Sequence, residues 1–359
     1  MEPRSLPELY ETHEGKVTDK WSSYLRVYEE LFRPYRDDPV RLLEIGIQNG
    51  GSLEIWARYF RAGTRIVGCD VNPDCGRLTY ADPRISVIVG DANDAATRQR
   101  ILAQSACYDI VLDDGSHRSG DIVKAFLNYF PKTAYGGIFV AEDLHCSYWQ
   151  DFEGGLFDPY SSITFFKHLA DIVNHESWGV ARSRSDLLQG IASKYGCDLD
   201  ESVLSEVHSV EFVNSICIVR KQPASQNQLG TRYVAGSVEE VVPGSLQLHG
   251  RGPNYFPDQS ANPWSARERP PGEDFPRIEG LLAQATSRAG ELEAQLSDRK
   301  RQVDDLNGAL SRLREQHRAE REELDRELRV LKQSASWRMT APYRWIGGRL
   351  KRLRGTAGL

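Results

Sequence analysis

Short apolar runs alternate with amphipathic stretches over the first 222 residues. The runs at 41–46, 65–70, 85–90, 108–113 and 137–142 are apolar and short, as expected for buried strands. Apolar residues recur at helical spacing between them, at 25–32, 53–60, 95–104 and 122–130. Because strands and helices alternate at this rhythm, the pattern predicts a parallel, doubly wound α/β sheet.

The pattern is weaker over residues 150–207. It predicts one helix at 161–175 and is otherwise irregular. Two short segments at 208–212 and 215–220 then predict a closing hairpin. We therefore expect one domain over residues 1–222, built on a mostly parallel sheet of seven strands.

The remaining chain changes character twice. Residues 223–276 are rich in Pro, Gly, Gln, Ser and Asn, which predicts a flexible linker. Residues 277–333 carry a heptad repeat, which predicts a left-handed coiled coil of undetermined strand number. A lone amphipathic helix folded onto the domain is the alternative. The apolar seam positions are Ile278, Leu282, Ala285, Ala289, Leu292, Leu296, Val303, Leu306, Leu310, Leu313, Leu324 and Leu331, and Arg299, His317, Glu320 and Glu327 fill the other positions.

The tail, residues 334–359, is basic and contains no acid. Arg338, Arg344, Arg349, Lys351, Arg352 and Arg354 alternate with aromatic and aliphatic residues. This amphipathic pattern suits the surface of an anionic membrane, and a solvated or partner-docked tail explains it equally well.

Composition excludes several classes. The net charge of −6 and pI of about 5.8 give no basic footprint for nucleic acid. The chain shows neither an apolar stretch long enough to span a membrane nor a secretory signal at its N-terminus. Its six cysteines lack metal-site spacing, so we expect reduced thiols in a cytoplasmic protein whose tail can approach the inner face of the membrane.

A glycine-containing loop follows the first predicted strand. Glycines let a backbone approach a ligand, and the helix that follows offers free N–H groups. Asp70 ends the second strand, where an acid can bind ribose hydroxyls. Gln48 stands where a dinucleotide loop has its second glycine, which argues against NAD. We expect an adenosine-containing ligand here, with Glu44, Gly46, Gly50, Ser52, Asp70, Asp91 and Asp113 as the binding residues; Asp91 could accept from the adenine amino group.

Acids gather at the ends of the fourth and fifth strands. The first group is Asp113 to His117, and the second is Glu142 to His145. If the two strands are neighbours, their carboxylates converge, which is costly unless a cation neutralises them. Oxygen-rich sites prefer Mg²⁺, Mn²⁺ or Ca²⁺ over Zn²⁺, and we expect Mg²⁺ or Mn²⁺ here. The alternative is that these residues cap helices and order loops. We predict Asp114, Glu142 and Asp143 as metal ligands and His117 as the general base.

These motifs, with Thr18, Asp19, Lys20 and Tyr24 upstream, resemble the metal-dependent sugar O-methyltransferases of macrolide biosynthesis. The resemblance covers roughly residues 10–222. It implies a Rossmann-like fold, S-adenosylmethionine and Mg²⁺ as cofactors, and a sugar hydroxyl as acceptor. Asp114, Glu142 and Asp143 match the family's metal ligands, His117 matches its base and Asp70 its ribose acid. Ala92 departs from the pattern, because many relatives have glutamine at that position.

The C-terminus is similar to a different group. Residues 335–344 resemble a segment that follows coiled coils in bacterial surface-polysaccharide glycosyltransferases and methyltransferases, although Tyr343 stands where leucine is more usual. This resemblance implies a lipopolysaccharide or capsule acceptor. The coiled coil would then make a homo-oligomer or hold a partner in glycan assembly.

The expected function is therefore methylation of a sugar of a bacterial glycan. A scaffold or regulator of polysaccharide assembly with a secondary methyltransferase domain is one alternative. An NAD-dependent oxidoreductase on a similar sheet is another, which the loop and the acid cluster disfavour.

Overall fold

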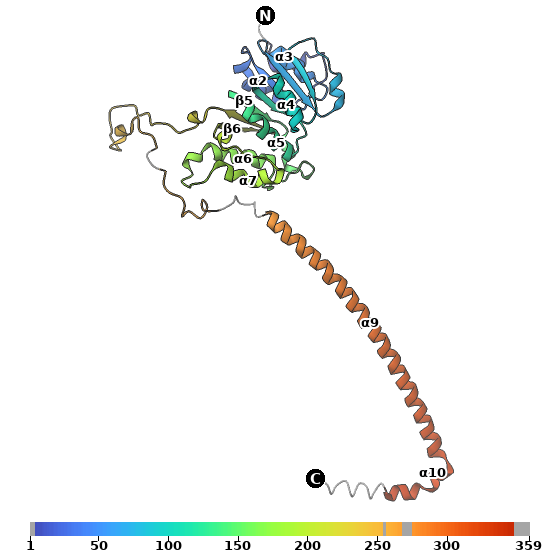
Figure 1. Ribbon diagram of the computed structural model, residues 1–359. Coiled ribbons are helices and arrows are strands. Elements are labelled where there is room, and N and C mark those ends of the chain that lie inside the picture. Colours follow the sequence, from blue (N-terminus) through green and yellow to red (C-terminus); the bar gives the residue numbers. More distant parts are fainter. Residues whose placement is uncertain (1–3, 254–255, 268–274, 348–359) are drawn as a thin grey trace. The chain divides into compact units, whose positions relative to one another are not determined.

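The computed structural model describes residues 4–253, 256–267 and 275–347, and in the last range side chains from residue 280 onward. Its contacts divide the chain into two units, Met1–Phe275 and Pro276–Leu359 (Figure 1). Each unit is described by itself.

The first unit is built on a seven-stranded sheet in the order β3-β2-β1-β4-β5-β7-β6. Strands β1 to β5 pair in parallel, and β7 returns antiparallel to both β5 and β6. This confirms the predicted sheet and its closing hairpin. The strands are β1 (Arg41–Ile45), β2 (Arg65–Asp70), β3 (Ile85–Val89), β4 (Tyr108–Asp113), β5 (Thr133–Ala141), β6 (Val207–Val213) and β7 (Ile216–Lys221).

Helices cover both faces of this sheet, because its strands are apolar on both sides. Along β1, Leu42 belongs to one core cluster and Leu43 to the other. The cluster of Leu42 includes buried residues of α1 (Leu6–Glu11), α2 (Ser22–Phe32) and α3 (Gly51–Tyr59). The cluster of Leu43 includes residues of α4 (Ala95–Gln104), α5 (Ser119–Tyr129) and α6 (Ser162–Val173).

The expectation that residues 150–207 are irregular outside one helix is wrong. After α6 the chain forms α7 (Arg184–Tyr195) and α8 (Glu201–Leu204). Helix α7 has a weak apolar stripe but strong end signals. Ser183 and Asp186 form a capping box, and Gly196 ends the helix at φ +65°.

Short 3₁₀ helices join the main elements. They are η1 (Arg33–Tyr35), η2 (Pro73–Arg77), η3 (Phe130–Lys132), η4 (Leu144–Tyr148), η5 (Gln150–Phe152), η6 (His175–Ser177), η7 (Ala224–Gln226) and η8 (Ser245–Leu248). Within the described residues between β7 and residue 267, η7 and η8 are the helices formed. Asn227 Nδ2 donates to Ser205 O at 2.8 Å, and Gln259 N donates to Gly179 O at 2.8 Å, so this stretch contacts the domain. Its flexibility stays a prediction.

The second unit is dominated by one helix, α9 (Phe275–Gln333). Ser334 caps the short helix α10 (Ala335–Met339) that follows, and residues 341–347 are again helical. A coiled coil requires a partner helix and therefore stays a prediction. The tail from residue 348, including Arg349, Lys351, Arg352 and Arg354, lies outside the described residues. Among the described helices, none has both the length and the apolar character needed to cross a membrane.

Candidate active site

A cavity of about 480 Å³ opens at the carboxyl edge of the parallel strands. Open α/β sheets bind their ligands at this edge, because the loops that connect strands to helices diverge there. The N-terminal stretch from Val17 to Tyr24 completes the wall. Every predicted site residue except Gly50 lines the cavity, namely Glu44, Gly46, Ser52, Asp70, Asp91, Asp113, Asp114, His117, Glu142 and Asp143.

Two glycines shape the loop after β1. Gly46 has φ +85°, and a Cβ atom there would lie 2.0 Å from the carbonyl oxygen of Asp114. Gly50 precedes α3 at φ +77°, where a Cβ atom would lie 2.0 Å from Tyr80 Oη. Both positions therefore require glycine for backbone conformation and for packing.

Asp70 holds the same loop from the end of β2. Its Oδ2 accepts from the backbone N–H groups of Ile47 and Gln48, each at 2.9 Å, and its Oδ1 accepts from Asn72 N at 2.8 Å. Gln48 adopts φ +45°, an unfavourable conformation for a side-chain-bearing residue. Asp70 thus sets the conformation of the loop. Its contact to a ribose stays a prediction.

Glu44 and Ser52 lie beneath the loop. The buried Glu44 carboxylate accepts from Ser52 Oγ at 2.7 Å and from Trp56 Nε1 at 3.0 Å. Its other oxygen, Oε1, is buried without a hydrogen-bond partner and lies 3.7 Å from Lys20 Nζ. Burial raises the pKa of Glu44.

Asp91 and Asp113 also line the cavity. Asp91 is exposed, and its Oδ1 accepts from Asn93 N at 2.8 Å. Asp113 ends β4, and its buried Oδ2 has no hydrogen-bond partner. Burial raises the pKa of Asp113 to about 8.

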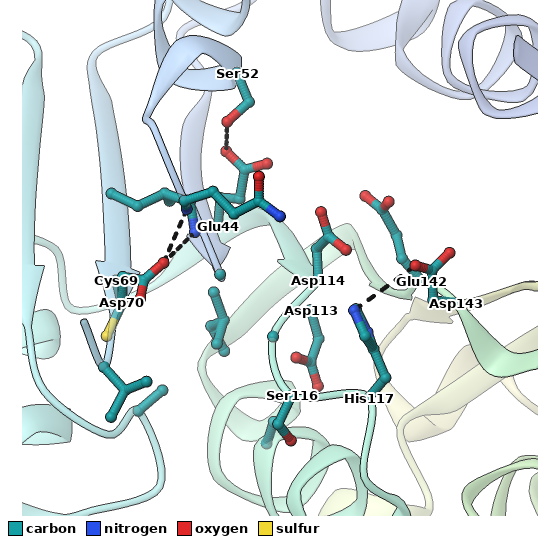
Figure 2. Close-up of a pocket in the computed structure, with 18 of the residues that line it drawn as sticks. Glu44, Ser52, Cys69, Asp70, Asp113, Asp114, Ser116, His117, Glu142 and Asp143 are labelled. Carbon is teal, nitrogen blue, oxygen red and sulfur yellow. Dashed lines mark hydrogen bonds and ion pairs between the residues drawn. The ribbon is translucent and has the colours of Figure 1, made fainter. Parts of the chain in front are cut away.

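The acids after β4 and β5 meet, as predicted, because these strands are neighbours. Ala141 is in register with Asp113, and Glu142 N donates to Asp113 O at 2.9 Å. Figure 2 shows Asp114, Glu142, Asp143 and His117 around one space. One ligand atom each from Asp114, His117 and Asp143 lie within 4.8 Å of one another, so this trio could hold a metal ion.

Lys20 occupies the other side of the acid cluster. Its Nζ donates to Glu142 Oε1 and Oε2 at 2.8 and 2.9 Å and also to Asp114 Oδ2. The Lys20 side chain is 3% exposed. Burial works to lower the pKa of Lys20, but Glu142 and Asp114 outweigh this effect and raise it well above its usual value. Lys20 is therefore charged and partly neutralises the cluster.

Aromatic residues of the N-terminal segment orient two of the acids. Tyr28 Oη donates to Glu142 Oε1 at 2.5 Å. Tyr24 Oη donates to Asp143 Oδ1 at 2.6 Å, and Trp21 Nε1 donates to the same oxygen at 3.1 Å. Glu142 thus faces Lys20 and Tyr28, while Asp143 faces His117 and belongs to the possible metal-binding trio.

The carboxyl groups of the cluster resist ionisation. Burial raises the pKa of Glu142 to about 7 and that of Asp114 to about 6, and Lys20 opposes both shifts. Carboxylates brought together in this way gain from a cation with more than one charge.

His117 faces the cluster in a strained conformation, with φ +57°. Its Nε2 lies 3.7 Å from Asp143 Oδ2, and its buried Nδ1 has no hydrogen-bond partner. Burial lowers the pKa of His117, against the pull of Asp143 and Glu142. A neutral imidazole at this place can accept a proton or bind a metal.

Sequence patterns alone gave no role to the residues that orient the acids. Lys20 and Tyr24 were noted only as matching a family segment, and Trp21 and Tyr28 were missed. A signal was available, because Trp21, Tyr24 and Tyr28 recur at intervals of three and four and so share one face of α2.

Known proteins resemble the first unit. Residues 43–144 match the family model described as a methyltransferase domain, which confirms the predicted class of domain. The 8-demethyl-8-alpha-L-rhamnosyl tetracenomycin-C 2'-O-methyltransferase of Streptomyces olivaceus is 37% identical over 185 residues, 49% of this chain and 48% of that protein. Mycinamicin VI 2''-O-methyltransferase of Micromonospora griseorubida is 37% identical over 184 residues, 47% of this chain and 45% of its own. The chain thus spans about half the length of the curated relatives it matches.

A solved structure agrees with this similarity. The methyltransferase MycE of mycinamycin biosynthesis, in complex with Mg, SAH and mycinamycin VI, superposes with a TM-score of 0.50 at 26% identity. The match covers 64% of this chain and 58% of MycE. It confirms the Rossmann-like methyltransferase fold.

Proposed function

We propose that this chain is an S-adenosylmethionine-dependent O-methyltransferase that uses Mg²⁺ and methylates a sugar hydroxyl. One observation carries the proposal. The glycine loop held by Asp70 and the cluster of Asp114, His117, Glu142 and Asp143 open into the same cavity. A donor bound at the loop and an acceptor bound at the cluster would therefore be neighbours, as methyl transfer requires.

The side chains that could bind a metal suit Mg²⁺. The carboxylates of Asp114 and Asp143, with that of Glu142 beside them, are hard oxygen ligands of the kind that Mg²⁺ prefers. Burial raises the pKa values of Asp114 and Glu142, so their charged forms are costly there unless a cation compensates them. A bound Mg²⁺ would supply positive charge that lowers the pKa of an acceptor hydroxyl. The relative MycE is described in complex with Mg and SAH.

The chain's own residues have distinct tasks in this proposal. The loop from Gly46 to Gly50, with Asp70 and Asp91, binds the donor. Asp114 and Asp143, together with Glu142, would hold the ion, and Lys20 would balance the remaining charge. His117 would accept the proton of the acceptor hydroxyl at Nε2, which faces the acid cluster, because burial lowers its pKa and favours the neutral imidazole.

The acceptor side offers aromatic surface. Trp21 and Trp149 are 60% and 51% exposed, and both pack edge-on against His145 near Asp143. Aromatic faces stack on the apolar faces of sugar rings, and the relatives named above are O-methyltransferases of rhamnosyl and mycinamicin substrates. The proposed acceptor is therefore a glycoside with a free sugar hydroxyl.

We extend this proposal to a bacterial surface glycan or its precursor as the acceptor. The support is the resemblance of residues 335–344 to segments of surface-polysaccharide enzymes. A competition assay separates the two acceptor classes. It offers the chain a rhamnosylated polyketide and a rhamnose-ended, lipid-linked oligosaccharide together and measures which of them is methylated. Preferential methylation of the polyketide would limit the acceptor to natural-product glycosides.

The first test is calorimetric titration of S-adenosylhomocysteine into the full chain with and without Mg²⁺. We expect binding in the micromolar range, weakened at least tenfold by Asp70→Asn. Asp74→Asn is the matched control, because Asp74 is exposed and pairs only with Arg77 among the ion pairs described. No binding in either condition would refute the proposed donor. Binding without methyl transfer to any glycoside would refute the proposed acceptor.

A further inference from the structure

The predicted heptad seam of α9 is uncovered along its described length. The side chains of Leu282, Leu292, Leu296 and Val303 are 50–64% exposed, and those of Leu306, Leu310, Leu313, Leu324 and Leu331 are 45–69% exposed. Helices in water are stabilised mainly by packing of such an apolar stripe. The stripe therefore requires a covering surface.

The sequence of α9 makes this requirement stronger. Gly280, Gly290 and Gly308 lie inside the helix, and glycine disfavours helix relative to alanine. The hydrogen bonds described between its side chains, such as Arg299 to Gln302, are exposed contacts within one helix. Such contacts add little stability in water.

The charged residues in the seam restrict how two copies could pair. In a parallel, in-register pair every seam residue faces itself. Arg299 would face Arg299, Glu320 would face Glu320, and Glu327 would face Glu327 of the second copy. Like charges brought together in a dehydrated seam are destabilising.

An antiparallel pair removes all these clashes. In this arrangement each a position faces a d position of the other helix. With the two helices fully overlapped, Arg299 faces Leu310, and Glu327 faces Leu282 of the second copy. Likewise His317 faces Leu292, and Glu320 faces Ala289. Each polar side chain then lies beside an apolar or small one and can extend its polar end into solvent.

The residues that flank the seam agree with this register. Arg288 approaches Glu323 of the second copy, and Glu293 approaches Arg314, so both pairs have opposite charges. Leu281 and Val330 come together at the ends, and they are 56% and 70% exposed in a single chain. Each contact occurs twice by symmetry, as in an isologous interface.

We propose that α9 pairs with α9 of a second copy as an antiparallel, two-stranded coiled coil in this fully overlapped register. The partner is a second copy of this chain because the seam is complementary to itself in that orientation. The proposal does not depend on the function of the first unit.

Cysteine cross-linking of the full chain tests the orientation. In the antiparallel register Ala289 of one copy faces Glu320 of the other. Within one helix the two residues lie roughly 46 Å apart, so they cannot be linked to each other in a single chain. We expect the double variant A289C/E320C to form a covalent dimer under mild oxidation. The single variant A289C, which keeps every charge of the seam, should stay unlinked. The native chain is the control, because its six cysteines are free and none lies in α9.

The outcomes separate the arrangements. A covalent dimer of A289C alone would show a parallel pair and overturn the proposal. A monomeric or trimeric mass of the native chain by light scattering would also overturn it. A dimeric mass together with linkage of the double variant alone supports it.

A charge exchange gives an independent readout. R288E should weaken dimerisation, because the new carboxylate would face Glu323 of the second copy. R288E/E323R should restore dimerisation, because the two charges are again opposite. R288E/E293R is the matched control, because that exchange repairs a parallel pair only. If R288E/E293R restored dimerisation and R288E/E323R did not, the antiparallel register would be overturned.

Discussion

Lys20 Nζ contacts both carboxylate oxygens of Glu142, at 2.8 and 2.9 Å, across 122 residues of sequence. Lys20 precedes α2, and Glu142 follows β5, so the ion pair ties the N-terminal segment to the centre of the sheet. It also places one fixed positive charge in a cluster where a divalent ion is proposed to bind. Lys20 and that ion would share the charge of Asp114 and Glu142.

The first prediction concerns this shared charge. Lys20→Met leaves the buried Glu142 and the partly buried Asp114 uncompensated, so the unfolding free energy without metal should fall by about 3–5 kcal/mol. Mg²⁺ should restore more stability to the variant than to the native chain. Thermal unfolding with and without 10 mM Mg²⁺ measures both effects. Lys16→Met is the control, because Lys16 pairs with Glu54 at a partly exposed position. Equal Mg²⁺ shifts in the native chain and the Lys20 variant would show that Lys20 and the ion do not share these carboxylates.

The second prediction separates two roles of His117. If it is the base, His117→Asn should reduce turnover at least about a hundredfold and leave Mn²⁺ affinity within threefold. If His117 is instead one of the metal ligands, the affinity for Mn²⁺ should fall together with turnover. Electron paramagnetic resonance of Mn²⁺ and single-turnover rates together decide. His168→Gln is a control at a histidine of α6, which lies outside the cavity lining. We expect turnover to fall while Mn²⁺ affinity is kept. A loss of Mn²⁺ affinity that matches the loss of turnover would contradict the role of His117 as the base.

The third prediction concerns Tyr24 as a positioning residue. Its hydroxyl orients Asp143 through a hydrogen bond of 2.6 Å. Groups that orient a metal ligand contribute about 10–100-fold to metal affinity. Tyr24→Phe should therefore weaken Mn²⁺ binding by about tenfold, without changing the affinity for S-adenosylhomocysteine. Tyr35→Phe is the control, because Tyr35 Oη donates to Gly136 O away from the cavity. Unchanged Mn²⁺ affinity would show that Asp143 needs no such support.

The fourth prediction tests the close approach at Gly46. Both Gly46 and Gly136 have positive φ, +85° and +81°, but a Cβ atom at Gly136 meets nothing within 4 Å. Gly136→Ala should cost about 1–2 kcal/mol from backbone strain alone. Gly46→Ala adds a collision with the carbonyl of Asp114, so it should cost at least about 2 kcal/mol more. Urea unfolding measures the difference, and equal losses would mean that the loop moves aside.

Much of the fold follows from local sequence. The strands at 65–70 and 108–113 and the helix at 95–104 were predicted with the bounds that the structure gives. The two strands are short apolar runs bounded by polar residues, so local preference and burial agree there. Helix α7 was missed because its apolar stripe is weak, and its capping box at Ser183 and Asp186 was overlooked.

The candidate site was also predictable only in part. The positions of Asp70, Asp114, Glu142 and Asp143 at strand ends were readable, because parallel strands bring their carboxyl ends to one edge. Their immediate partners were not. The contacts of Lys20 with Glu142 and of Tyr24 with Asp143 join residues 122 and 119 positions apart, and no periodicity links such distant residues.

By itself the sequence determined the doubly wound sheet, the edge on which the acids gather and the heptad spacing of α9. Each follows from short apolar runs, from a repeat of three and a half or 3.6 residues, or from the direction of parallel strands. Only the tertiary structure decided that Glu142 turns toward a buried ammonium while Asp143 turns toward His117. That choice depends on how the N-terminal segment packs over the sheet edge, where burial makes the placement of each charge an energetic requirement.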